Sequence, residues 1–236
     1  MPHRSPITIF DWFASELSLD GRAAFVRRIA PHLIDLVQPG DRVLDLCCGT
    51  GPVALLLDEV GALVTGIDLA PGLLDAARRE ADKRGANAEF IQADVFTADP
   101  GAGQYDLALC LGNALQDFPH DHLPHFTRNV ARALRPGGRF VIHYLDGVMR
   151  LLSRMKNPDE TVHAPPCRIR KRFVNYDPVR AAYDAEYHNL TLDESCVYTG
   201  YIHTGPAIRT VFERHFALER PMRLDDHEFL DRYVRR

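Results

Sequence analysis

The sequence lacks the features of a membrane-spanning, secreted or fibrous protein. No apolar run in its 236 residues approaches the roughly 18 residues of a membrane-spanning helix. The N-terminal segment MPHRSPITIFDWF has no apolar core followed by small residues, so no secretion signal is expected. Hydrophobic residues make up 46% and charged residues 25% of the chain, a balance that excludes disordered and coiled-coil proteins. We therefore expect one folded domain in the cytoplasm, with no membrane partner.

Cysteine is scarce, and its spacing does not match a zinc site. The five cysteines include an adjacent pair, which fits reduced thiols better than a set of disulfides. A cluster of histidines at 120, 122 and 125 raises the possibility of a metal site, but Asp121 as the cap of a helix beginning at His122 explains it more simply. We expect no metal. The net charge of −4 argues against general binding to nucleic acids.

From residue 41 the pattern alternates between short apolar strands and amphipathic helices. This alternation predicts an α/β fold with a doubly wound, Rossmann-like sheet. A helix over 22–37 precedes it, and a helix near 207–215 and strands over 216–224 and 229–234 would complete seven strands. The other predicted strands are 42–46, 63–68, 89–92, 106–110 and 139–144, and the other predicted helices are 53–60, 71–84 and 122–134.

The pattern changes after Asp146. Segments 168–175 and 183–192 alternate polar and apolar residues, as antiparallel strands with one wet face do. We expect them to form an insertion over the carboxyl ends of the parallel strands, where doubly wound folds bind ligands. The predicted divisions of a single domain over 1–236 are a helical cap (1–40), a cofactor-binding core (41–147), a substrate-covering insertion (148–205) and the end of the sheet (206–236).

A glycine-rich turn, VLDLCCGTG over 43–51, joins the first strand to a helix. Its glycines permit left-handed backbone conformations and close approach to a ligand. The pattern Gly49-x-Gly51-x-x-Ala54 also satisfies the dinucleotide fingerprint, with Asp68 near the position of the acidic ribose partner. A nicotinamide-dependent oxidoreductase is therefore one open alternative.

Charge favours a different cofactor. Asp45 ends the first strand, where a dinucleotide would place two phosphate charges that a carboxylate repels. The same carboxylate would attract the ammonium group of S-adenosylmethionine (SAM). Asp68 can accept both ribose hydroxyls, Asp94 can accept the adenine amino group, and Leu69 and Leu73 can pack on the adenine face.

On these residues the chain resembles the class I SAM-dependent methyltransferases. The resemblance rests on VLDLCCGTG over 43–51, GIDLAPGLL over 66–74, QADVF over 92–96 and LRPGGRFVI over 134–142. Cys47 departs from the glycine or alanine that is usual in the family. The cofactor-binding residues assigned by the motifs and the resemblance are Trp12, Arg22, Asp45, Cys47, Gly49, Thr50, Gly51, Asp68, Leu69, Leu73, Asp94, Val95, Leu111 and Gly112.

Within that class, LCLGNALQDFP over 109–119 resembles the corresponding segment of glycine and sarcosine N-methyltransferases. The resemblance implies that Leu111 and Gly112 touch the cofactor, that Arg22 holds its carboxylate, and that Trp12 and Phe13 cover its sulfonium. It also implies that Asn113 borders the methyl acceptor. The arginine that clamps glycine in those enzymes is missing from the stretch after the fifth strand, so a different small acceptor is expected. The predicted substrate-binding residues are Asn113, Gln116, His143 and Tyr144, and the last two are also the predicted catalytic residues.

The resulting hypothesis is methyl transfer from SAM to a small molecule, most simply at an amine nitrogen, with S-adenosylhomocysteine as the other product. Methylation of a hydroxyl or carboxyl oxygen stays open, as does a SAM-binding partner subunit without catalysis. Three arginines at 168, 170 and 172 share one strand face and could grip an acidic substrate or RNA. A solvated face of an edge strand is the simpler interpretation of these arginines.

Overall fold

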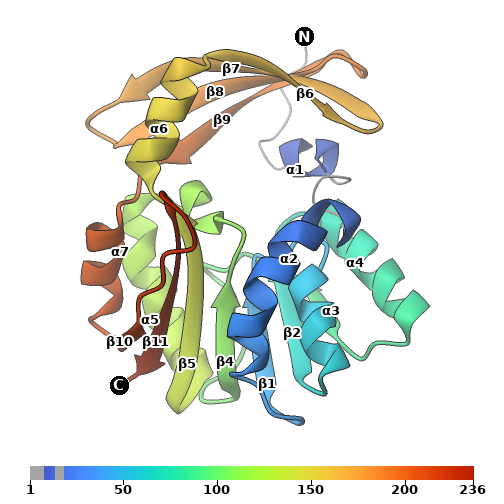
Figure 1. Cartoon of the computed structure of the whole chain (residues 1–236), viewed down its shortest axis with the longest axis vertical. Helices are drawn as coiled ribbons and strands as arrows, with labels where there is room; N and C mark the ends of the chain where they lie inside the picture. Colours follow the sequence, from blue (N-terminus) through green and yellow to red (C-terminus); the bar gives the residue numbers. More distant parts are fainter. Residues whose placement is uncertain (1–7, 14–18) are drawn as a thin grey trace.

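The computed structural model describes residues 8–13 and 19–236. Two layers are visible in Figure 1, an α/β core below and a curved antiparallel sheet above it. None of the helices in these described ranges is long and apolar enough to cross a bilayer.

The core is built on a seven-stranded sheet whose order is β10-β11-β5-β4-β1-β2-β3. All neighbouring strands are parallel except β11, which runs antiparallel to both β5 and β10. The order reverses between β1 and β4, which creates the crevice at the carboxyl edge where such sheets bind ligands. The predicted doubly wound seven-stranded sheet is therefore confirmed. The strands are β1 (Arg42–Leu46), β2 (Leu63–Asp68), β3 (Glu89–Gln92), β4 (Tyr105–Cys110), β5 (Leu134–Leu145), β10 (Phe216–Arg220) and β11 (Glu228–Arg235).

Helices cover both faces of this sheet because successive strand residues point to opposite sides. On β4, Leu107 and Leu109 pack with α2, α3 and α4, whereas Ala108 and Cys110 pack with α5 and α7. The result is one apolar core on each face. The helices are α2 (Leu19–Ile34), α3 (Pro52–Glu59), α4 (Pro71–Arg84), α5 (Leu123–Ala133) and α7 (Gly205–Phe212), with two single 3-10 turns, η1 (Ala114–Asp117) and η2 (His120–His122).

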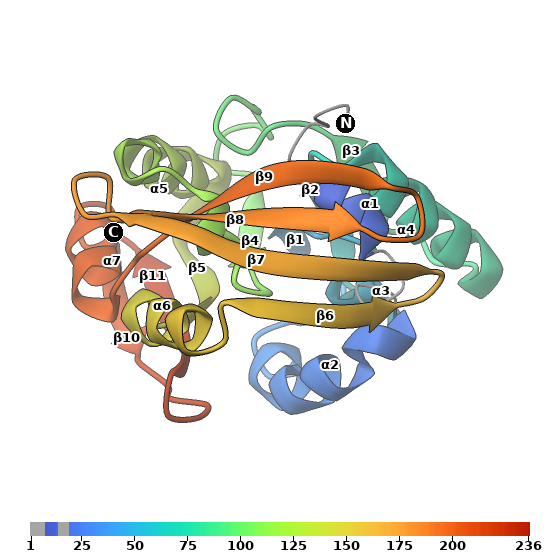
Figure 2. The ribbon, with the colours of Figure 1, turned by 90° about the horizontal axis from the view of Figure 1, so that it is seen from above.

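The upper layer, which we call the roof, consists of helix α6 (Gly147–Lys156) and a sheet of order β6-β7-β8-β9. Seen from above, its strands lie across the core, with α1 (Thr8–Trp12) beneath one end (Figure 2). More buried residues alternate with less buried ones at the start of β7 and along most of β8. The strands are β6 (Asp159–Ala164), β7 (Cys167–Asp177), β8 (Ala182–Asn189) and β9 (Glu194–Tyr201).

The chain enters and leaves the roof at one point. The backbone N–H of Gly147 donates to the carbonyl of His203 at 2.9 Å. A Cβ atom at residue 147 would lie 2.7 Å from the backbone nitrogen of His203, so only glycine permits this approach. Asp146 caps α6 by accepting from the backbone N–H groups of Val148 and Met149.

Two local predictions are corrected here. Strand β7 lies inside the roof sheet between β6 and β8, so the arginines at 168, 170 and 172 are not on an edge strand. Their outward, exposed face is as predicted, and Arg170 and Arg172 pair with Asp159 and Glu186 of the adjacent strands. The other correction concerns α5, which starts at Leu123, and in the described chain no side chain caps its N-terminus. Asp121 lies in η2 instead.

Candidate active site

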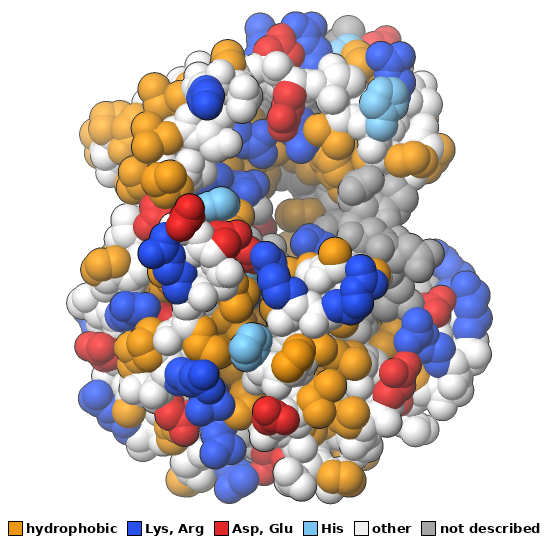
Figure 3. All heavy atoms as spheres, in the orientation of Figure 1, with side chains coloured by type: hydrophobic (Ala, Val, Ile, Leu, Met, Phe, Trp, Pro, Cys, Tyr) orange, Lys and Arg blue, Asp and Glu red, His pale blue; other side chains and the backbone are white. Residues whose placement is uncertain are grey.

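A cavity of about 750 Å³ lies between the carboxyl edge of the core sheet and the underside of the roof. Figure 3 shows a hollow between the two layers, with Lys and Arg side chains on its upper wall. The lower wall, or floor, comes from the loops after β1, β2, β3 and β4. The upper wall comes from α6 and the inner faces of the roof strands. The volume of the cavity falls within the range of small-molecule and cofactor sites.

The turn after β1 brings backbone close to this cavity. Cys47, Gly49 and Gly51 all have left-handed backbone conformations, with φ of 58°, 59° and 72°. A left-handed conformation at residue 47 explains why glycine is usual there in the resembled family. Gly51 itself packs away from the cavity, because a Cβ atom there would lie 2.6 Å from the ring of Phe90. Gly51 therefore shapes the turn and is not among the residues that line the cavity.

Two carboxylates stand beside this turn. Asp68 Oδ2 accepts from the backbone N–H of Gly49 at 2.8 Å, and Oδ1 accepts from that of Ala70 at 2.9 Å. Asp45 is only 3% exposed. Burial, and to a smaller extent the charge of Asp68, raises the pKa of Asp45 to about 7. A buried carboxylate with a raised pKa gains most from a cationic ligand, because a positive charge there favours its ionised form.

The remaining floor residues extend the cavity beyond β2 and β3. Leu69, Leu73, Asp94 and Val95 all line it, as does Thr50. Asp94 Oδ1 accepts from the backbone N–H of Phe96, which fixes its orientation at the end of β3. The structure therefore brings the predicted adenine-side residues together on one wall.

Arg22 lines the cavity at the opposite end of the floor. Its guanidinium lies over the ring of Phe25 at 5.7 Å and next to Gly112. Leu111 and Gly112 both line the cavity beside it. Trp12, in contrast, does not line the cavity, since its side chain is buried in an apolar cluster between α1 and the roof. The aromatic residues of α1 and its following turn that do reach the cavity are Phe10 and Phe13.

The predicted catalytic pair, His143 and Tyr144, is not brought to this cavity. His143 is 3% exposed, accepts from the backbone N–H of Asn113 through Nδ1 at 3.1 Å, and contacts Glu228 through Nε2 at 2.6 Å. Tyr144 is 1% exposed and donates to Asp231 at 3.0 Å. Both side chains are buried in contact with carboxylates of β11. This geometry does not support a role for either in proton transfer to the acceptor.

Asn113 and Gln116 take different positions. The Asn113 side chain accepts from the backbone N–H of Leu145 at 2.8 Å and thereby joins the ends of β4 and β5. It does not line the large cavity. Gln116 does line it, and its buried Oε1 has no hydrogen-bond partner among the described residues. Of the predicted acceptor-binding residues, only Gln116 is therefore placed to meet a ligand directly.

Asp117 is a cavity residue that sequence reasoning missed. Its carboxylate accepts from the Tyr198 hydroxyl, which reaches down from β9. Burial raises the pKa of Asp117 to about 6, although the Tyr198 hydrogen bond and the charge of Arg150 act in the opposite direction. This hydrogen bond joins a carboxylate of the floor to a side chain of the roof, and both residues line the cavity. Asp117 lies one residue beyond Gln116 in the segment quoted for the resemblance, and no signal in the sequence singled it out.

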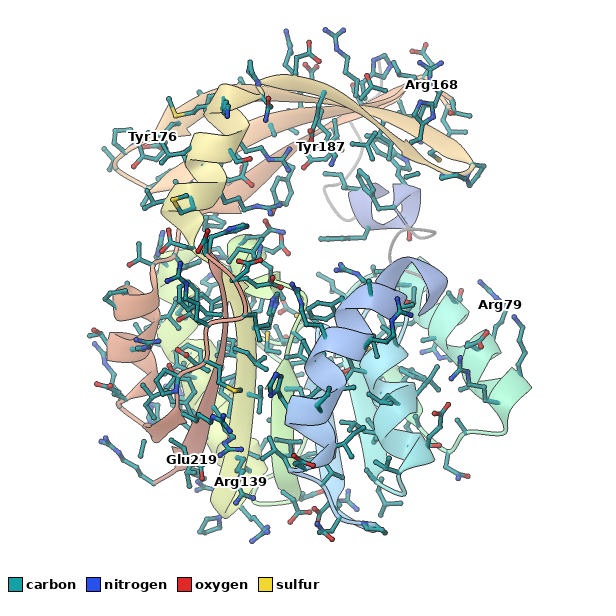
Figure 4. All side chains as sticks on the ribbon, viewed as in Figure 1. Arg79, Arg139, Arg168, Tyr176, Tyr187 and Glu219 are labelled. Carbon is teal, nitrogen blue, oxygen red and sulfur yellow. The ribbon has the colours of Figure 1, made fainter. Side chains whose placement is uncertain are left out.

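The roof contributes four further polar side chains that were missed. Arg150 and Arg154 project from α6, Lys171 from β7 and Tyr187 from β8, and all four line the cavity. Figure 4 shows Tyr187 on the side of the roof sheet that faces the core. Lys171 lies between Arg170 and Arg172 in sequence, so the alternation of the strand turns it inward while they turn outward. That alternation is the signal that could have found it.

Comparison with known proteins relates the floor to one family. A family model described as a methyltransferase domain matches residues 43–138, which is the segment from β1 into β5. A SAM-dependent methyltransferase of Clostridium acetobutylicum superimposes with a TM-score of 0.71 over 93% of this chain and 91% of that one, at 14% identity. The chain has the class I methyltransferase fold.

Sequence relatives also match only part of the chain. A demethylmenaquinone methyltransferase of Thermus thermophilus is 38% identical over 103 residues, 43% of this chain and 46% of the relative. A ubiquinone biosynthesis O-methyltransferase of Erwinia tasmaniensis is 32% identical over 143 residues, 57% of this chain and 58% of the relative. The chain thus spans about half the length of these curated relatives. The glycine and sarcosine N-methyltransferases that the sequence resembles locally do not appear among the relatives named here.

Proposed function

We propose that this chain is a SAM-dependent methyltransferase that acts on a small molecule inside the cavity, in the cytoplasm. One observation carries the proposal: Asp45, Asp68 and Asp94 end three successive parallel strands on one wall of a cavity that a second layer covers. A covered cavity favours an enzyme over a SAM-binding partner subunit, since a subunit without an acceptor site has no need for a roof. The covering role of 148–205 is part of this proposal.

The residues present fit SAM better than a dinucleotide. The buried Asp45 carboxylate suits an ammonium group and would repel a pyrophosphate. Asp68 keeps lone pairs beyond the two that bind Gly49 and Ala70, and these could accept from ribose hydroxyls. Asp94 would accept from the adenine amino group, and Arg22 would hold the carboxylate of the methionine moiety.

The chemistry needs little covalent help from the protein. Bound SAM supplies a methyl group on a positive sulfonium, and transfer forms a bond from that carbon to the acceptor as the carbon–sulfur bond breaks. The chain aligns the acceptor with the methyl group and keeps water out, and alignment alone can contribute roughly 7–11 kcal/mol. Asp117 is the group that we assign to take the acceptor's proton. Its raised pKa of about 6 suits a general base at neutral pH.

The acceptor atom that we favour is an amine nitrogen. A cationic amine would be attracted to the ionised Asp117 and then lose its proton to it before attack. The alternative is a hydroxyl oxygen, which the Erwinia relative, named as an O-methyltransferase, supports. Asp117 could serve either acceptor. An ammonium group must lose a proton before its nitrogen can attack, which gives a methylammonium product, and a hydroxyl must lose its proton as its oxygen attacks, which gives a neutral ether.

The test is a calorimetric titration with S-adenosylhomocysteine, with NAD as a parallel control, followed by a transfer assay with methyl-labelled SAM. We expect micromolar binding of S-adenosylhomocysteine and no binding of NAD. Matched panels of aromatic and aliphatic amines and of the corresponding alcohols and phenols then separate nitrogen from oxygen acceptors. Binding of NAD alone would contradict the proposal. If label is found only in phenols or alcohols, the acceptor atom is oxygen and not nitrogen.

A further inference from the structure

The roof presents a cluster of positive charge to the cavity. Arg150 and Arg154 lie one turn apart on α6, and Lys171 reaches the same space from β7. The Arg154 and Lys171 side chains are only 14% and 17% exposed. Three cations are therefore held in a largely enclosed space and not on the solvated surface, where most lysines and arginines lie.

Two carboxylates partly neutralise these three cations: Asp117, on which the charge of Arg150 acts, and Glu160. Glu160 is shared between Arg154 at 3.1 Å and Lys171 at 3.5 Å, and it is 42% exposed at the rim. The other hydrogen-bond partners of the arginines are neutral phenols: Tyr183 for Arg150 and Tyr187 for Arg154. Burial lowers the pKa of Lys171, and the charges of Arg154 and Arg150 lower it further. The cations thus repel one another, and an anion between them would relieve that repulsion.

The cofactor assigned above does not use this cluster. Its ammonium, ribose and adenine groups fall to Asp45, Asp68 and Asp94, and its carboxylate falls to Arg22, all on the floor. The roof cations face the remaining part of the cavity, where Asp117 and Tyr198 also lie. Apolar and aromatic surface adjoins them, since Lys171 lies 4.9 Å from the ring centre of Phe13, and Phe13 packs edge-on against Tyr187.

We propose that the methyl acceptor is an anion, with a carboxylate or phosphate group bound by Arg150, Arg154 and Lys171 and an apolar or aromatic body against Phe13 and Tyr187. This inference rests on the proposed function and names its substrate class. In that pose the group to be methylated points toward Asp117 on the floor, and the anionic end lies against the roof cations. The anionic group would fix the orientation of the acceptor, which is what an in-line transfer requires.

The test uses a matched pair of fluorescent probes, anilinonaphthalene sulfonate and its uncharged parent N-phenyl-naphthylamine. Lys171→Met removes one roof cation and keeps its apolar stem. The control is Arg168→Met, which removes an exposed charge from the outward face of the same strand (labelled in Figure 4). We expect Lys171→Met to weaken binding of the sulfonate about tenfold and to leave the parent unchanged, because only the sulfonate loses a charged partner. Arg168→Met should change neither.

Arg154→Met is the second variant, and thermal melts confirm that each variant is folded. If both Lys171→Met and Arg154→Met bind the sulfonate as tightly as the wild type, the inference is overturned. Displacement of the sulfonate by benzoate or by phenyl phosphate identifies the anionic group, and displacement by neither also counts against it. Titration of each variant with S-adenosylhomocysteine keeps the two proposals separate. If the wild type does not bind S-adenosylhomocysteine, the proposed function is contradicted. The fluorescent probes test the cation cluster independently of that result.

Discussion

The floor and the roof of the cavity differ in almost every property that decides function. The floor carries carboxylates at strand ends, is built from consecutive strand–turn–helix units, and is matched by known methyltransferases. The roof carries cations and phenols on antiparallel strands, and it lies outside the segment that the family model matches. We therefore assign the floor to the proposed cofactor and the roof to the proposed acceptor.

The difference teaches where to look for specificity in this fold. Asp117 and Tyr198 mark the boundary, because each belongs to a different layer and the two meet in one hydrogen bond. If the division of labour holds, floor variants change cofactor affinity and roof variants change acceptor binding. Variants at the boundary change the rate of transfer.

The largest expected effect is at that boundary. Asp117→Asn keeps the size of the side chain but removes the proposed base, and we expect kcat to fall about 10²- to 10⁴-fold. Affinity for S-adenosylhomocysteine should change less than about twofold, within the usual scatter for a group that makes no cofactor contact. The matched control is Asp121→Asn, an exposed carboxylate in the next turn. A kcat close to that of the wild type would remove Asp117 from the mechanism.

The next largest effect is expected on the affinity for the cofactor product, from a variant of the floor. Asp68→Ala should weaken S-adenosylhomocysteine by about 100-fold, because each hydrogen bond to a charged group contributes roughly 1.5–3 kcal/mol. The loss of its bond to the Gly49 N–H should also loosen the turn after β1. Asp75→Ala, an exposed carboxylate on α4, is the control and should bind normally. Equal affinities in a calorimetric titration would contradict the assigned cofactor site.

A smaller effect is expected from pH. The free protein's Asp45 has a pKa of about 7, and the ammonium of the ligand should lower it, so binding releases a proton below that pH. Affinity for S-adenosylhomocysteine should therefore fall by up to about tenfold for each pH unit below about 7. Calorimetry in buffers of different ionisation enthalpy measures the released proton directly. Asp45→Asn should bind more weakly and lose both signatures, and a pH dependence that persists in it would point to another group.

The last effect is on stability, and its dependence on pH has the opposite sign to that of affinity. Because the folded protein raises the pKa of Asp45, folding favours its protonated form, and its contribution to stability falls as pH rises from about 4 to about 7. Asp45→Asn should therefore raise the free energy of unfolding by on the order of 1–3 kcal/mol above about pH 7. Near pH 4 the gain should vanish, which provides an internal control. Thermal melts at the two pH values measure it, and a destabilised variant at high pH would contradict the raised pKa.

The floor could be predicted from the sequence because its signals are local. The turn after β1 and the carboxylates at the ends of β1, β2 and β3 each follow directly from a strand that the apolar pattern identifies. His143 does not reach the cavity, for a non-local reason. It does lie at a strand end, but its partner Glu228 comes from β11, 85 residues away in sequence, and that pairing buries it. Tyr144 is buried in the same way by Asp231.

The roof was harder to predict because its helix reverses the usual pattern. On α6 the apolar side chains Val148, Met149, Leu152 and Met155 are 45–54% exposed, whereas Arg150 and Arg154 turn inward. Hydrophobic periodicity alone would place the arginines in solvent. Antiparallel pairing in the roof also depends on contacts between strands that the sequence pattern does not register. Strands β6 and β9 were therefore missed, although β7 and β8 were found.

The contact between Gly147 and His203 has a consequence for how such a protein changes over generations. The roof is one continuous stretch whose two ends meet at a backbone hydrogen bond. Replacing the stretch leaves the neighbouring core residues where they are, since closing a loop between two adjacent points costs little more as the loop lengthens. A single exchange of contiguous coding sequence could therefore give this fold a new acceptor in one event. The machinery that binds the methyl donor would be inherited unaltered.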